Sequence, residues 1–142
     1  MSELRPFTVE HGRFLMWVCN ERALLERVHD GQFERAAQGF AWTVWDHEPL
    51  IAGGITSPWR GLGEAWLLWR PGLDGMQRRA ALRATRWVLD EGTRVLKLHR
   101  LQAVVQCVDT WVRFAAHFGF QHESVLYDFG PNKETFYMMV RQ

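Results

Sequence analysis

The sequence is short of several residue types, and each shortage excludes a class of protein. Only two cysteines occur in 142 residues, Cys19 and Cys107, and neither belongs to a CxxC or Cys/His pattern. A disulfide scaffold is therefore excluded, and we expect two buried thiols in a reducing compartment. The six histidines show no HExxH or other ligand spacing, so the sequence predicts no metal site.

Long apolar runs and an excess of one charge are also missing. No stretch approaches the ~18 apolar residues of a membrane span, and the N-terminal residues lack the apolar core of a secretion signal. The 17 basic and 16 acidic residues leave a net charge of +1, which does not favour nucleic acid as a partner. We therefore expect a cytoplasmic protein without a membrane or nucleic-acid partner.

What remains is the composition of one globular domain over residues 1–142, with 47% hydrophobic and 23% charged residues. Its aromatic content is uneven, since eight Trp and nine Phe stand against two Tyr. Trp42 and Trp45 are three residues apart, so they cannot share one face of a regular strand. Trp59 lies in a segment with Pro and Gly, and we expect it to be exposed for contact with a ligand or partner.

Hydrophobic spacing and turn residues predict alternating strands and helices. Strands are expected at 4–7, 40–46, 50–56, 64–69, 101–107, 124–129 and 135–140. Helices are expected at about 8–28, 76–99 and 109–118, with a short helical turn in the ambiguous segment 29–39 and a loop at 57–63. The strand–helix–strand unit over 64–107 implies one parallel pair. We therefore expect an α/β fold, a mixed twisted sheet of six or seven strands with helices on both faces.

Two local features bear on function. Gly53 and Gly54 inside a strand indicate a bulge or a close approach of two backbones. Seven of the 17 basic residues lie on or just after the long helix: Arg78, Arg79, Arg83, Arg86, Arg94, Lys97 and Arg100. They form either a solvated face or, at the start of the helix, a surface directed at phosphate.

The order of the elements, with the residues at their turns, resembles the GNAT superfamily of acyl-CoA-dependent N-acyltransferases. Before the long helix, members read roughly E-apolar-x-x-L-x-V-x-P-x-x-R-G-x-G. The run that starts at Glu64 here is EAWLLWRPGLDGMQ. Pro71 matches the proline and Gly75 the first of the paired glycines. Asp74 stands in place of the arginine, and Gln77 in place of the second glycine.

The resemblance implies that this turn holds the pyrophosphate of coenzyme A at a helix N-terminus. The implied contacts to acetyl-CoA or CoA come from Leu68, Trp69, Arg70, Gly72, Gly75, Met76, Gln77, Arg78 and Arg79. A carboxylate at Asp74, ~5 Å from the phosphates, would repel them by about 3 kcal/mol and weaken binding about 100-fold, unless it turns away as an N-cap. Arg78 and Arg79 would restore positive potential.

The resemblance also implies the catalytic groups. Glu64 lies where members carry a glutamate that takes a proton from the substrate amine, and partial burial beside Trp66 would favour this role. The alternative is that Glu64 only begins a strand in solvent. The short helix ends FAAHFGF, so Ala115 replaces the tyrosine that protonates the departing CoA thiolate. His117 or Tyr127 would have to supply that proton.

A closer resemblance exists to the small GNAT-like internal virion proteins of short-tailed podophages. The shared features are PLIAGG at 49–54, Trp66, the basic helix that begins with Arg78 and Arg79, and VRF at 112–114. They imply a phage or prophage origin, with a location in the host cytoplasm or the virion. Two functions stay open: an N-acyltransferase for a small-molecule or protein amine, and a non-catalytic virion or DNA-ejection protein that binds virion proteins. Either could form a homodimer.

Overall fold

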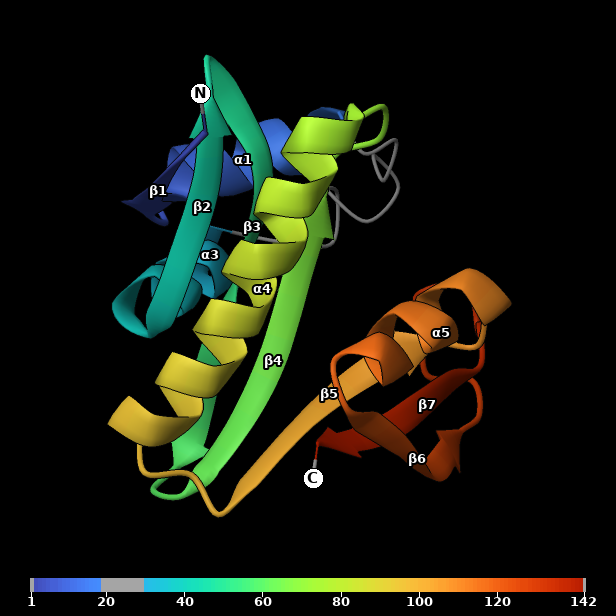
Figure 1. Cartoon of the computed structure of the whole chain (residues 1–142). Helices are drawn as coiled ribbons and strands as arrows, with labels where there is room; N and C mark the ends of the chain where they lie inside the picture. The colour runs from blue at the N-terminus through green and yellow to red at the C-terminus, as the bar shows by residue number, and fades with distance from the viewer. Residues whose placement is uncertain (1, 19–29, 142) are drawn as a thin grey trace.

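A computed structural model describes residues 2–18 and 30–141, which form one seven-stranded sheet in the order β1-β2-β3-β4-β5-β7-β6 (Figure 1). The strands are β1 (Glu3–Pro6), β2 (Phe40–Asp46), β3 (Glu48–Trp59), β4 (Leu62–Trp69), β5 (Arg100–Gln106), β6 (Phe120–Leu126) and β7 (Phe136–Arg141). The helices in these residues are α1 (Val9–Val18), α3 (Asp30–Gln38), α4 (Gly75–Val95) and α5 (Asp109–His117). Among the strands of the described residues, only β4 and β5 pair in parallel, so the predicted mixed α/β sheet is confirmed.

Helices cover both faces of the sheet, with α1 and α3 on one face and α4 on the other (Figure 1). The side chains of β2 alternate between these layers. Trp42 contacts Trp87 of α4, with ring centroids 5.6 Å apart, and Trp45 contacts His11 of α1 at 5.4 Å. The two tryptophans therefore lie on opposite faces, as their spacing predicts. No helix in the described residues is long and apolar enough to cross a membrane.

Three buried clusters hold these layers together. One lies under α1 and α3: Phe7, Leu15, Met16, Phe33, Ala36, Ala41 and Ala52. A second lies under α4: Val44, Leu50, Ile51, Leu73 and Ala81. The third joins α4, α5 and the C-terminal strands: Ile55, Leu89, Leu101, Ala115, Phe118, Phe120 and Met139.

The structure corrects several predicted boundaries. Residues 57–63 are not a loop, because β3 continues to Trp59 and only Arg60 and Gly61 turn the chain. The Ser57 hydroxyl oxygen lies 2.8 Å from the Trp59 carbonyl oxygen and 2.7 Å from that of Leu62, so its one proton can be donated to either carbonyl across this tight turn. Gly61, with φ +90°, adopts a backbone conformation that other residues rarely take.

Other corrections concern the helices and β6. The ambiguous segment contains the nine-residue helix α3, and α4 ends at Val95 rather than near residue 99 because Lys97 turns to φ 51°. β6 starts at Phe120, four residues earlier than predicted. The predicted helix over 8–28 is observed to Val18, and its remaining residues lie outside the described part. Cys107 is exposed, so the expectation of a buried thiol is wrong there; Cys19 is not described.

The glycine pair in β3 marks a close approach of two backbones. A Cβ atom on Gly54 would lie 2.4 Å from the carbonyl oxygen of Phe40 in β2. The irregularity in the β2–β3 ladder lies elsewhere, between Val44 and Trp45. Of the two predicted explanations, the close approach is therefore the one observed.

The parallel pairing of β4 and β5 is short. Past its end the two strands separate and leave a wedge-shaped gap between them. The pairing runs over three residue pairs, from Leu62↔Arg100 to Glu64↔Gln102. Beyond Glu64, β4 follows β3 as far as Trp69, whereas β5 follows β7 (Figure 1). The sheet therefore splits into an N-terminal and a C-terminal half that diverge from this point.

Candidate functional site

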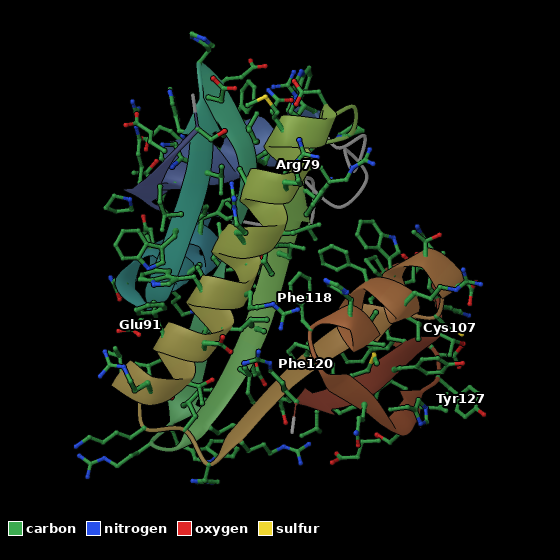
Figure 2. All side chains as sticks on the ribbon, in the orientation of Figure 1. Arg79, Glu91, Cys107, Phe118, Phe120 and Tyr127 are labelled. Carbon is green, nitrogen blue, oxygen red and sulfur yellow. The ribbon has the colours of Figure 1, made fainter. Side chains whose placement is uncertain are left out.

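The diverging strands enclose a cleft of about 480 Å³. Its first wall is β4 from Ala65 to Trp69, with Thr85 and Leu89 of α4; its second is β5 from Ala103 to Gln106, with α5 and Phe136 of β7. Phe118 and Phe120 project from the C-terminal half toward α4 (Figure 2). Among the described residues that line the cleft, none carries a titratable side chain. A volume of this size suits a small organic ligand.

Aromatic rings dominate the cleft and cross it. Trp69 of β4 meets Phe114 of α5 edge to face, with ring centroids 5.3 Å apart. Phe114 in turn contacts Trp111 at 6.3 Å and Phe118 at 5.1 Å. These rings provide an apolar surface that excludes water and suits the methylene groups of a ligand.

The edge of β4 supplies polar groups to this apolar space. The Arg70 N–H donates to the Leu50 carbonyl of β3 at 3.1 Å. Because N–H and C=O groups alternate between the two edges of a strand, the backbone groups of Leu67 and Trp69 point toward the cleft. The resemblance implied contacts from residues 68–70; by this alternation the backbone of Leu68 and of Arg70 faces β3. Leu67 was not predicted as a contact.

The indole N–H of Trp66 is a further polar group at this strand. Trp66 lines the cleft, and its ring meets Phe7 at 4.9 Å on the α1 face of the sheet. Its Nε1 atom is buried and has no hydrogen-bond partner in the described part of the chain. Buried N–H groups are nearly always paired, so this donor is a marked exception.

The turn predicted to bind phosphate is already occupied by hydrogen bonds between its own residues. Asp74 is the N-cap of α4, and its Oδ1 atom accepts from the Gln77 N–H at 2.8 Å, while the Gln77 Oε1 atom accepts from the Asp74 N–H at 3.1 Å. The Gln77 amide also donates to Asp46 Oδ2 at 3.3 Å. This hydrogen bond is the main reason that the pKa of Asp46 lies below its usual range. The N-cap conformation left open for Asp74 is thus the one observed.

The other predicted coenzyme contacts surround this turn. The Arg70 guanidinium pairs with Glu48 at the start of β3. Arg78 donates to the Leu73 carbonyl at 3.5 Å, and Met76 and Arg79 are exposed on the first turns of α4 (Figure 2). Glycine at 72 and at 75 borders open space, since an added Cβ atom would meet nothing within 4 Å.

The structure does not bring the three predicted catalytic residues together. Glu64 lies at the closed end of the wedge, where its Oε1 atom accepts from Gln102 Nε2 at 3.0 Å. Its side chain is exposed, so the expected burial beside Trp66 is wrong. His117 ends α5 and borders an outer groove with Arg86 of α4, rather than the cleft. Tyr127 follows β6, 78% exposed and on the side away from α4 (Figure 2).

Ala115, in contrast, lies where the resemblance placed the missing tyrosine. It is buried and lines the cleft from α5. Sequence reasoning missed Trp111 and Phe136 in the lining. The spacing of Trp111, Phe114 and Phe118 along one helix face was a signal that could have indicated the aromatic wall.

Comparison with known proteins identifies this architecture as that of GNAT acetyltransferases. No family model and no curated protein sequence matches the chain. A GNAT-family acetyltransferase from Bacillus anthracis superposes with a TM-score of 0.69 and 14% identity, covering 98% of this chain and 93% of that one. Ard1 from Thermoplasma volcanium gives 0.69 and 13%, covering 99% and 96%. A variant of the spermidine N-acetyltransferase SpeG from Vibrio cholerae gives 0.70 and 16%, covering 98% and 94%. At these identities the likeness establishes the fold.

Proposed function

We propose that this chain binds a pantetheine thioester such as acetyl-CoA between β4 and β5, and that it transfers the acyl group to an amine. The observation that carries the proposal is the end of the β4–β5 ladder at Glu64↔Gln102, beside an apolar cleft. A pantetheine arm is extended and contains two amides, so it can pair with the edge of β4 at Leu67 and Trp69 as an added strand would. The fold shared with acetyltransferases supports this.

The fit of the coenzyme differs between the cleft and the helix turn. The cleft suits the arm, since its walls are apolar and the edge of β4 presents the backbone groups of Leu67 and Trp69. The first turn of α4 does not suit the diphosphate, because Asp74 already occupies the Gln77 amide. We therefore place only the arm on this chain, with Leu67, Trp69 and the aromatic wall as its contacts.

When bound, a thioester supplies an activated acyl group. The aromatic walls exclude water and so protect that group from hydrolysis. The attacking amine must lose a proton, and we propose that Glu64, next to Ala65 of the lining, takes it through a water molecule. Gln102 donates to the Glu64 carboxylate and so orients it as a positioning residue.

The departing thiolate must gain a proton, and the cleft lining offers no obvious donor. Ala115 has none to give. We propose His117 over Tyr127 for this role, because α5 forms a wall of the cleft whereas Tyr127 lies beyond β6. The imidazole would act through solvent, from the outer groove that it borders with Arg86, rather than from within the cleft.

A second function is favoured by one observation, the lack of titratable side chains among the described residues of the lining. A non-catalytic module with the same fold, such as a structural protein of a phage particle, needs a contact surface but no acid or base. Trp59, 65% exposed at the β3–β4 turn, is the side chain we propose for such a contact.

Calorimetry and turnover separate the two functions. The acyltransferase proposal expects saturable binding of acetyl-CoA and release of free thiol in the presence of a polyamine or a lysine peptide. Glu64→Gln should lower kcat about 100-fold or more without changing donor affinity, because it removes only the proton acceptor. Glu123→Gln is the matched control, since Glu123 on β6 is another exposed carboxylate and pairs with Arg100 of β5. Binding without turnover on any amine would favour the non-catalytic module.

A further inference from the structure

The first turn of α4 carries an anion of its own. Asp74 and Gln77 form a reciprocal pair in which the carboxylate accepts from the third amide of the helix at 2.8 Å and the Gln77 side chain accepts from the Asp74 N–H at 3.1 Å. The carboxylate therefore takes the place at the positive end of the helix where a bound phosphate would lie.

A second carboxylate adds to the negative charge at the first turn of α4. Asp46 Oδ2 accepts from Gln77 Nε2 at 3.3 Å, so the same glutamine joins two acidic residues. A diphosphate placed at this turn would meet the charge of Asp74 and would have to displace its hydrogen bond to Gln77. At ~5 Å and an effective dielectric of about 20, the repulsion alone corresponds to about 100-fold in affinity.

The three neighbouring arginines are placed differently. The Arg70 guanidinium pairs with Glu48, and the Arg78 guanidinium reaches the Leu73 carbonyl at 3.5 Å. Arg79 is exposed on the helix surface. The turn thus combines an occupied amide with one arginine paired at β3, one that reaches the Leu73 carbonyl within the turn, and one exposed on the helix.

The cleft next to this turn has the opposite character. It holds about 480 Å³ of mostly apolar space, bordered by the β4 edge and the Trp69–Phe114 contact. These features recognise an extended apolar chain with amides and require no charge on the ligand.

We propose that the cleft selects its acyl donor by the pantetheine arm alone, so that the adenosine diphosphate of a CoA thioester adds no affinity. The inference rests on the proposed function, because it assumes a thioester in the cleft. The Asp74 carboxylate binds the Gln77 N–H that a phosphate would otherwise bind, and its negative charge repels the diphosphate from the helix turn.

The test compares acetyl-CoA with S-acetylpantetheine on the wild-type chain by calorimetry. We expect dissociation constants within about 3-fold of each other. Asp74→Ser keeps an N-cap, because serine caps about as well as aspartate, and removes the charge. This variant should bind acetyl-CoA 10- to 100-fold more tightly and S-acetylpantetheine unchanged. The control is Asp109→Ser, which changes the net charge of the protein by the same amount but removes the carboxylate from the first turn of α5.

The outcomes are distinct. If wild-type chain binds acetyl-CoA 30-fold or more tightly than S-acetylpantetheine, the diphosphate is recognised and this inference is overturned while the proposed function stands. If Asp74→Ser leaves the affinity for acetyl-CoA unchanged, the Asp74 carboxylate does not keep the diphosphate away from the helix turn, and this inference is overturned. If wild-type chain binds neither thioester at millimolar concentration, the proposed function itself fails, and this inference with it.

Discussion

Arg141 and Asp90 join the two diverging halves of the sheet. The Nη2 atom of Arg141, at the end of β7, donates to Oδ1 of Asp90 on α4 at 2.6 Å. Its Nε atom donates to the Phe118 carbonyl after α5 at 2.7 Å. The Arg141 side chain is only 15% exposed. One guanidinium therefore connects α4, which packs on the N-terminal half, to two elements of the C-terminal half.

Arg141→Met should lower the free energy of unfolding by about 2–3 kcal/mol. The substitution keeps an apolar stem but leaves the Phe118 carbonyl without its charged donor. Arg94→Met is the control, because Arg94 pairs with Glu91 on an exposed helix surface, where such pairs contribute about 0.5 kcal/mol or less. Urea denaturation measures both. Equal effects of the two variants would show that Arg141 does not connect the halves.

The order of the elements could be predicted from the sequence because each has a local signal. Residues 40–46 alternate in polarity, and Pro71 with Gly72 ends the apolar strand at 64–69. The extension of β3 through Pro58 could not be predicted, since Pro and Gly normally indicate a loop. Here the Ser57 hydroxyl lies within hydrogen-bond distance of two carbonyls of the turn and can donate to either, a contact that composition does not reveal. Helix α3 was ambiguous because its buried face consists of little more than Phe33 and Ala36.

The site was partly predictable for the same reason. Asp74 lies before α4 and Ala115 within α5, in segments whose residues can be matched to the family one by one; the structure shows Asp74 as the N-cap of α4 and Ala115 in the lining of the cleft. Phe136 reaches the cleft only through the pairing of β7 with β5, where it lies opposite Gln106. The exposure of Glu64 and of Tyr127 likewise depends on neighbours distant in sequence, which spacing does not reveal.

Gly54→Ala should destabilise the protein strongly. Its Cβ atom would lie 2.4 Å from the Phe40 carbonyl oxygen and 2.7 Å from the Ala41 Cα atom, so β2 and β3 would have to separate. We expect a loss of about 3 kcal/mol or more, at the upper end of overpacking effects. Gly75→Ala is the control, since its Cβ atom would enter open space at a helix start, where alanine is favoured by up to about 1 kcal/mol. Thermal unfolding of both variants checks the difference. Similar melting temperatures would contradict the close approach of the strands.

Ala115→Trp should block the cleft. Ala115 is buried and faces the cleft from α5, so an indole there would occupy the space assigned to the pantetheine arm. We expect at least a 10-fold loss of affinity for S-acetylpantetheine. Ala116→Trp places the same ring on the exposed side of α5 and should bind normally. Quenching of tryptophan fluorescence, which Trp69 and Trp111 make sensitive to the cleft, provides the readout. Unchanged binding by Ala115→Trp would place the ligand elsewhere.

His11 should make the stability depend on pH. Its Nδ1 atom accepts from the Thr8 N–H at 3.3 Å and lies 2.9 Å from Oγ1 of the fully buried Thr43. The backbone donor requires a lone pair on Nδ1, so the neutral ring carries its proton on Nε2. Burial, and then the charge of Arg5, hold the pKa of His11 below its ordinary value of about 6.5. The folded state therefore binds a proton less readily than the unfolded chain.

The sign of the effect follows from this difference. The contribution of His11 is fully present above about pH 6.5, and it is lost as the pH falls from there through the lower pKa of the folded state. The slope in that window should approach, at most, about 1.4 kcal/mol per pH unit. His11→Asn keeps an acceptor near the Nδ1 position but does not titrate, so its unfolding free energy should depend less on pH between 7 and 5. His47→Gln, at an exposed turn, should leave the wild-type slope intact. Urea denaturation at several pH values gives the slopes, and identical slopes for wild-type and His11→Asn would refute the assignment.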